Sequence, residues 1–264
     1  MREALESAVY VPRSESLVKV VAALSLRLEA FTRLSPNDKA AIASLSKTSR
    51  VVSPRRDLIR EGEHPRYIHL MLDGWACRYK SLPDGRRQIV AFFVPGDFCD
   101  LNVYVLKAMD HSIAAVTRLS VTDISRDDMD KLTTDHPRIT QALWWEALVN
   151  AAIQREWTLN VGQRTAYERI SHLLVELFLR LKTVGLTQGN SCDFPLTQTD
   201  IADATGLTAV HVNRTLQELR RDNLIELDRR RLNIPDLQRL MEAAMFNANY
   251  LHLDHEGRHL DANQ

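Results

Sequence analysis

Side chains that suit the edges of DNA bases gather in one short segment of this sequence. Residues 196–219 read LTQTDIADATGLTAVHVNRTLQEL, two short helical patterns separated by Gly206. Arginine can bind guanine O6 and N7 with two hydrogen bonds, asparagine and glutamine can pair with adenine, and valine can contact a thymine methyl group. The second pattern therefore predicts a base-reading face made of Ala209, Val210, Asn213, Arg214 and Gln217.

The helices that must position this face have recognisable starts. Thr197 can cap the first helix, with Asp200 three positions on, and Thr208 can cap the second. Gly206 permits a tight turn, and the small Ala202 lets the two helices approach closely. The segment predicts a helix-turn-helix; an ordinary helical hairpin with a solvated charged surface is the alternative.

A wing is predicted after the second helix. Residues 224–227 and 232–234 read as short strands that flank the basic tip Asp228-Arg229-Arg230-Arg231. Polar side chains at helix starts, and arginines at such a tip, suit phosphate oxygens. The residues predicted to contact the DNA backbone are Thr197, Gln198, Thr208, Arg229 and Arg230.

The region before this module has a strand-rich pattern. Glycines stand at positions 62, 74, 85 and 96, close to every eleventh residue, and turn-forming residues stand beside them. Strands bounded by turns at this spacing indicate a β-sandwich or β-roll. Pro83-Asp84-Gly85 is the predicted tip of a hairpin, and residues 113–124 form a further extended stretch.

Helices are predicted on both sides of the strands, first over residues 17–45 and then from Pro137 to about Gly162. The second is apolar on two opposite faces, so it needs two covers. The strands can supply one cover, and the same helix of another subunit can supply the other. A helix sunk inside one larger domain is the alternative. The residues assigned to this dimerisation helix are Leu143, Trp144, Leu148, Ile153 and Trp157.

Composition limits how the chain can bind nucleic acid and where it acts. Among 264 residues, 34 basic side chains balance 34 acidic ones, so any DNA contact must be local. Three widely spaced cysteines offer neither a disulfide framework nor a zinc motif. No signal-peptide core or membrane-spanning run is evident, and we expect a cytoplasmic protein.

The order of these elements resembles the Crp/Fnr superfamily of bacterial transcription regulators. The likeness rests on the β-roll with regular glycines, Gly96-Asp97-Phe98, the long helix, and a winged helix that contains VNRTLQELRRDNLI; it covers about residues 30 to 240. It implies an α+β fold whose N-terminal β-roll is like a cyclic-nucleotide-binding domain (a double-stranded β-helix or jelly-roll). It also implies a homodimer with coiled-coil central helices, an effector or redox signal sensed in the roll, a near-palindromic DNA site, and contact with RNA polymerase.

The sequence patterns and this resemblance together predict five segments. They are a helical extension at 1–29, an effector-sensing β-roll at 30–136, a dimerisation helix at 137–162, a winged helix-turn-helix at 163–246, and a polar, flexible tail at 247–264.

The candidate effector pocket departs from the cyclic-nucleotide members. Those members resemble one another in a Gly-Glu pair and a later Arg-Ser or Arg-Thr pair, whereas this chain has an acid and no arginine at these places. An acid where a phosphate should approach, with no arginine facing it, argues against cyclic AMP. The candidate pocket residues are Asp100, Leu101, Asn102, His111 and Ser112.

Other cofactors find little support. Three cysteines cannot form a four-thiolate iron-sulfur cluster within one chain. Cys99 lies close to where haem-sensing relatives place an axial ligand, but a small buried residue beside a turn is the favoured interpretation. His252, His255 and His259 could gather around a metal, although a flexible tail is a poor scaffold for one, so no metal site is predicted.

The leading hypothesis is therefore a homodimeric, sequence-specific DNA-binding transcription regulator, and not an enzyme. One alternative is a cupin-like metal-dependent enzyme, which needs clustered histidine and glutamate ligands on neighbouring strands. Another is an effector-sensing module that binds protein instead of DNA. The sequence does not identify the effector, the operator or the sign of regulation.

Overall fold

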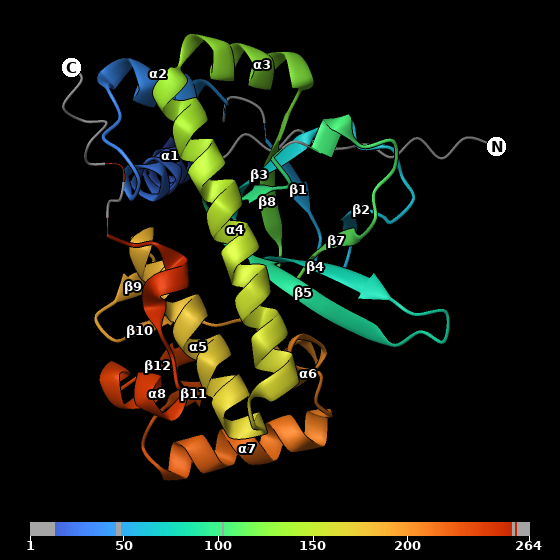
Figure 1. Ribbon diagram of the computed structural model, residues 1–264, viewed down its shortest axis with the longest axis vertical. Coiled ribbons are helices and arrows are strands. Elements are labelled where there is room, and N and C mark those ends of the chain that lie inside the picture. Colours follow the sequence, from blue (N-terminus) through green and yellow to red (C-terminus); the bar gives the residue numbers. More distant parts are fainter. Residues whose placement is uncertain (1–13, 46–48, 102, 255–256, 258–264) are drawn as a thin grey trace.

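The computed structural model of the chain describes residues 14–45, 49–101, 103–254 and 257. A strand-rich unit occupies one end and a smaller, mostly helical module the other, and one long helix runs between them (Figure 1). This α+β arrangement confirms the predicted fold class. Within the described residues, no helix combines the length and hydropathy that crossing a bilayer requires.

The strand-rich unit is a β-roll of two antiparallel four-stranded sheets, with strand orders β1-β8-β3-β6 and β2-β7-β4-β5. Its strands are β1 Arg50–Val52, β2 Asp57–Ile59, β3 Ile68–Asp73, β4 Ala76–Ser81, β5 Arg87–Phe93, β6 Phe98–Cys99, β7 Ser112–Ala115 and β8 Leu119–Ile124, with the short 3₁₀ helix η1 at Val103–Val105. Tyr79 pairs with Ile89 across the predicted hairpin. Gly74 has a positive φ of 83°, and an added Cβ would lie 2.3 Å from the Arg118 carbonyl oxygen, so only glycine fits this turn.

Four helices flank the roll: α1 Ser14–Glu29, α2 Pro36–Leu45, α3 Arg126–Asp135 and α4 Pro137–Gln163. Ser125 caps α3 by accepting the Asp128 amide, and Pro137 opens α4 at a position where its missing N–H costs nothing. The inner face of α4 is buried against the roll and the C-terminal module, and Phe92 and Trp157 meet edge to face at 6.0 Å.

The C-terminal module surrounds the buried helix α5. It comprises α5 Ala166–Thr183, β9 Thr187–Gln188, β10 Ser191–Asp193, α6 Gln198–Thr205, α7 Ala209–Arg221, β11 Glu226–Asp228, β12 Arg231–Asn233, α8 Leu237–Ala243 and the 3₁₀ helix η2 Ala248–Leu251. Its four strands form one antiparallel sheet in the order β11-β12-β10-β9. The wing therefore shares a sheet with the hairpin that precedes the helix-turn-helix.

The prediction of a flexible tail is wrong for its first part. The Tyr250 hydroxyl donates to Glu176 at 2.9 Å, and Leu251 is buried against the core of the module. Two contacts of this kind outweigh the polar composition that suggested a loose segment. His252 ends η2, whereas His255 and His259 lie outside the described residues.

Candidate nucleic-acid interface

Local hydrogen bonds build the helix-turn-helix. Thr197 and Asp200 form a complete capping box at the start of α6, in which the Asp200 amide donates to Thr197 Oγ1 at 3.1 Å and the Thr197 amide donates to Asp200 Oδ2 at 2.9 Å. Gly206 ends α6 in the left-handed region at φ 66°. Thr208 caps α7 by accepting the His211 amide at 3.2 Å. Four residues read from the sequence thus fix both helix starts and the turn.

The inner faces of the two helices share one apolar core. Ile201 and Ala202 of α6 and Val212 of α7 are buried, and Leu207 in the turn is half-buried. Because α7 is strongly amphipathic, burying this face leaves its polar side toward solvent.

The five residues predicted to read bases all lie on that outer side. Val210 is 82% exposed, and the Arg214 side chain is 69% exposed, with its Nε 4.0 Å from Glu218 Oε1. Helix α7 lies at the end of the molecule farthest from α3, with no roll strand over it (Figure 1). The exposed residues of the face are Ala209, Val210, Asn213, Arg214 and Gln217.

The five residues predicted to contact phosphates are exposed too: Thr197, Gln198, Thr208, Arg229 and Arg230. Arg229 and Arg230 form the tip between β11 and β12, and both have positive φ. Arg230 and Thr197 line one cleft of about 840 Å³, whose other wall is the roll surface at Arg55 and Arg118. Sequence reasoning did not connect these roll arginines with the helix-turn-helix, because the two segments meet only in the folded chain.

The residues assigned to the dimerisation helix lie on two different faces of α4. Leu143, Ile153 and Trp157 are buried within the chain, so they lie on the face of the helix that the chain itself covers. Trp144 and Leu148 are 66% and 68% exposed. A spacing of alternately four and three residues connects the exposed positions Trp144, Leu148, Ala151, Arg155, Thr158 and Gly162. This heptad spacing is typical of a coiled-coil seam.

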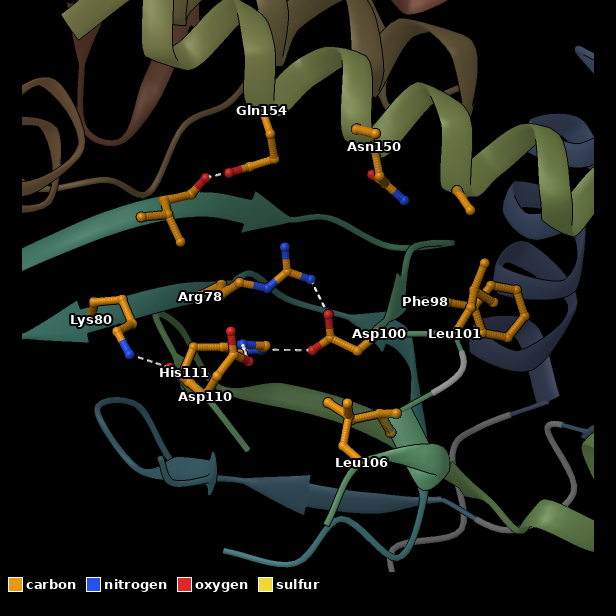
Figure 2. Close-up of a pocket in the computed structure, with 14 residues that line it drawn as sticks. Arg78, Lys80, Phe98, Asp100, Leu101, Leu106, Asp110, His111, Asn150 and Gln154 are labelled. Atoms are coloured by element: carbon orange, nitrogen blue, oxygen red, sulfur yellow. Dashed lines mark hydrogen bonds and ion pairs between the residues drawn. The ribbon is translucent and has the colours of Figure 1, made fainter. Parts of the chain in front are cut away.

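A second candidate site is a pocket of about 570 Å³ between the roll and α4 (Figure 2). Arg78 of β4, Asp100 and His111 point toward one another on the roll side, while Asn150 and Gln154 lie on α4. Arg78 pairs with Asp100 and lies over the Phe93 ring at 5.0 Å. His111 Nε2 lies 2.8 Å from Asp100 Oδ2, and its Nδ1 lies 2.7 Å from Asp110 Oδ1.

The structure brings some of the predicted effector-pocket residues together around this pocket and places others elsewhere. Asp100, Leu101 and His111 line the pocket. Ser112 does not, because its hydroxyl accepts the Glu61 amide at 2.9 Å. Asn102 lies outside the described residues. The prediction that no arginine faces Asp100 is wrong, since Arg78 of β4 forms an ion pair with Asp100, which directly follows β6.

The pairing leaves this pocket internally satisfied. Burial works to raise the pKa of Asp100, but the hydrogen bond from His111 and the charge of Arg78 outweigh it, so the pKa is lowered. Asp100 is therefore ionised, and Arg78 already has an anionic partner. Such an arginine is poorly placed to neutralise an incoming phosphate.

The three cysteines, Cys77, Cys99 and Cys192, are free and buried. Burial raises the pKa of Cys77 to about 11 and that of Cys192 to about 12, and it also raises the pKa of Cys99. A buried protonated thiol is a poor metal ligand and a poor redox nucleophile. Across the described residues, no three His, Cys, Asp or Glu side chains are arranged to hold a metal ion.

A winged helix-turn-helix with an exposed second helix, joined to a β-roll, is the architecture of a DNA-binding transcription regulator. Residues 168–243 match the model of the Crp-like helix-turn-helix domain, and residues 49–136 match that of the cyclic nucleotide-binding domain.

Named relatives and a solved structure agree with these family matches. The chain is 30% identical over 213 residues to the transcriptional activator protein FnrL of Cereibacter sphaeroides, covering 78% of this chain and 85% of FnrL. It is 31% identical over 219 residues to the transcriptional activatory protein AadR of Rhodopseudomonas palustris, covering 81% and 86%. The solved structure of FixK2 from Bradyrhizobium japonicum superposes with a TM-score of 0.68 at 26% identity, covering 76% and 98%.

The chain belongs to the Crp/Fnr family and is a DNA-binding transcription regulator. These findings do not favour the enzyme and the protein-interaction module that the sequence left open.

Proposed function

We propose that the protein acts as a homodimer that reads a near-palindromic DNA site, with α7 of each subunit in successive major grooves. The observation that carries the proposal is the outer face of α7, where Arg214 and its polar neighbours are exposed, and where Arg214 lies 4.0 Å from the nearest acidic oxygen among the described residues. Recognition helices of a dimer reach two half-sites one helical turn apart, about 34 Å.

Each residue of this face has a proposed role. Arg214 binds guanine through two hydrogen bonds, and Asn213 and Gln217 pair with adenine or hold phosphate. Val210 contacts a thymine methyl group, where many relatives carry a glutamate that accepts from cytosine, so the half-site differs from the one they read. Ala209 lies beside Val210 at the start of α7 and permits close approach to the base edges.

The backbone contacts set the register of the module on DNA. Thr197, Gln198 and Thr208 stand at helix starts, where backbone N–H groups also face an approaching phosphate. Arg229 and Arg230 at the wing tip add positive charge.

The dimer forms through the exposed stripe of α4, the heptad-spaced positions from Trp144 to Gly162. Trp144 and Leu148 are large apolar side chains in water, and covering them with the same stripe of a second subunit removes that exposure. Because FnrL and AadR are named transcriptional activators, we propose activation of transcription in the cytoplasm through contact with RNA polymerase.

The effector side of the proposal is that cyclic AMP is not the signal. Asp100 forms an ion pair with Arg78 and places negative charge where a cyclic phosphate would approach. Calorimetric titration with micromolar cyclic AMP is expected to give no saturable heat. A clear saturable isotherm would overturn this part alone.

The test of DNA reading is a gel shift with sheared DNA of the source genome and excess random competitor. We expect retained fragments that share a two-fold symmetric sequence, with two chains bound to each site. Retention without a shared sequence, or one chain per site, would contradict the proposal.

A further inference from the structure

A chain of buried charges connects parts of the molecule that lie far apart in sequence. Arg27 of α1 contacts Glu146 of α4 through Nε at 2.9 Å and Nη2 at 2.7 Å, and its Nη1 lies 2.6 Å from Asp97 Oδ1 in the turn after β5. Arg180 of α5 donates to the other Asp97 oxygen at 2.8 Å. All four side chains are less than 10% exposed.

Asp97 is therefore shared between α1 and the DNA-binding module. Arg180 also donates to the Phe92 carbonyl at 2.9 Å and lies 3.5 Å from Glu176, which accepts from Trp157 of α4. These contacts fix α5 against the roll and the dimer helix. Because α6 and α7 pack on α5, the orientation of α7 depends on them.

Charge balance makes Arg27 necessary to this arrangement. The carboxylates of Asp97 and Glu146 lie against the two cations Arg27 and Arg180, and Glu176, a carboxyl whose pKa is raised by burial, lies 3.5 Å from Arg180. Burial alone would lower the pKa of Arg27, but Asp97 and Glu146 hold it above its ordinary value. Without Arg27, Glu146 would keep Asn150 as its partner at 3.3 Å, and its Oε2 already has no hydrogen-bond partner in the described structure.

Helix α1 lies outside both family models, which match residues 49–136 and 168–243. We propose that Arg27 is a positioning residue for DNA recognition: through Asp97 and Arg180, it fixes the orientation of the DNA-binding module relative to the roll and the dimer helix. This inference rests on the proposed dimeric reading of DNA.

A fixed module holds two recognition helices at one separation, so a dimer with a looser module tolerates a changed distance between half-sites. The test measures binding of the symmetric site retained by the wild type and of versions with one base pair added or removed at its centre. Couplings between sites are typically 5- to 150-fold. We expect Arg27→Gln to bind the best site about tenfold more weakly and to discriminate less among the three spacings, with Arg27→Lys intermediate.

Lys39→Gln is the matched control. It breaks the 2.7 Å surface ion pair between Lys39 of α2 and Glu29, which lies on α1 like Arg27, and is expected to keep the wild-type spacing profile. Should Arg27→Gln not fold, Arg27→Lys and Glu146→Gln, which keep the buried charges closer to balance, are measured in the same way.

A lowered unfolding midpoint with an unchanged spacing profile would show a merely structural role and overturn the proposal, as would a wild-type profile in the two replacement variants. If the wild type itself retains no symmetric site, the proposed function fails first.

Discussion

Arg78 and Arg214 are the same side chain in opposite surroundings. Arg78 lies in the roll pocket, paired with Asp100 and stacked on Phe93. Arg214 stands on the outer face of α7, and among the described residues its ion pair with Glu218 is long, at 4.0 Å. An arginine recognises an external partner only when its own chain leaves the guanidinium available. Arg214 on α7 is therefore available to an external ligand, whereas Arg78 in the pocket already pairs with Asp100 of its own chain.

The largest loss of DNA affinity should follow from a substitution that separates the two subunits and so the two copies of α7. Leu148→Glu places a charge in the α4 stripe, and a monomer binds a single half-site. We expect sedimentation to show monomers and affinity for a retained fragment to fall about 100- to 10,000-fold, the range by which linked sites exceed single ones. Leu186→Glu changes an exposed leucine of the C-terminal module and should leave both measurements unchanged. Persistent dimers of Leu148→Glu would refute the α4 interface.

Removing the available arginine should have the next largest effect. Arg214→Ala is expected to cost about 1–3 kcal/mol on a retained fragment, to relax preference at one base pair, and to change binding to random duplex little. Arg221→Ala, at the exposed end of the same helix, should weaken both kinds of binding alike if it contacts DNA at all. Competition filter binding measures the two affinities. An equal loss on both DNAs for Arg214→Ala would contradict base reading.

Removing the charge of Asp100, the partner of Arg78, tests the other half of this comparison. Asp100→Asn leaves Arg78 largely buried without its anion, and we expect urea unfolding to show a loss of about 1–3 kcal/mol. Sulfate should restore part of this stability by binding the Arg78 guanidinium, which no longer has an anionic partner. Asp110→Asn, whose side chain is 80% exposed, is the control and should have a small effect. No loss, or no response to sulfate, would mean that the pairing does not hold the pocket.

Falling pH should weaken the core of the C-terminal module before it weakens the pocket. Burial and the charge of Arg164 lower the pKa of His172 to about 3, so the unfolded chain binds its proton near pH 6.5 while the folded chain does not. Stability is therefore lost as pH falls from about 6.5 toward 3, by at most about 1.4 kcal/mol per pH unit.

The pKa of Asp100 is lowered from 3.8, so its contribution is present above that value and is lost only in stronger acid. His172→Gln should flatten the dependence between pH 6.5 and 4.5, as followed by urea unfolding at several pH values. An unchanged slope would show that His172 is not the group responsible.

What could be read from the sequence was local. Thr197, Gly206 and Thr208 define caps and a turn within a few residues, and the helix-turn-helix followed from them. The pairing of Arg78 with Asp100 could not be read, because it depends on which strands are neighbours and in which register. Periodicity showed that α4 has two apolar faces but not which one the chain itself covers; the folded chain buries Leu143 and Trp157 and leaves Trp144 and Leu148 exposed.

The central claim is that the exposed face of α7 reads bases and is presented twice. Selection of bound sequences from random DNA, run in parallel with wild type and Arg214→Ala, tests it most directly. We predict a two-fold symmetric motif for the wild type and the same motif with preference lost at one base pair in each half-site for the variant. Identical motifs from both proteins, or a wild-type motif without symmetry, would contradict the account.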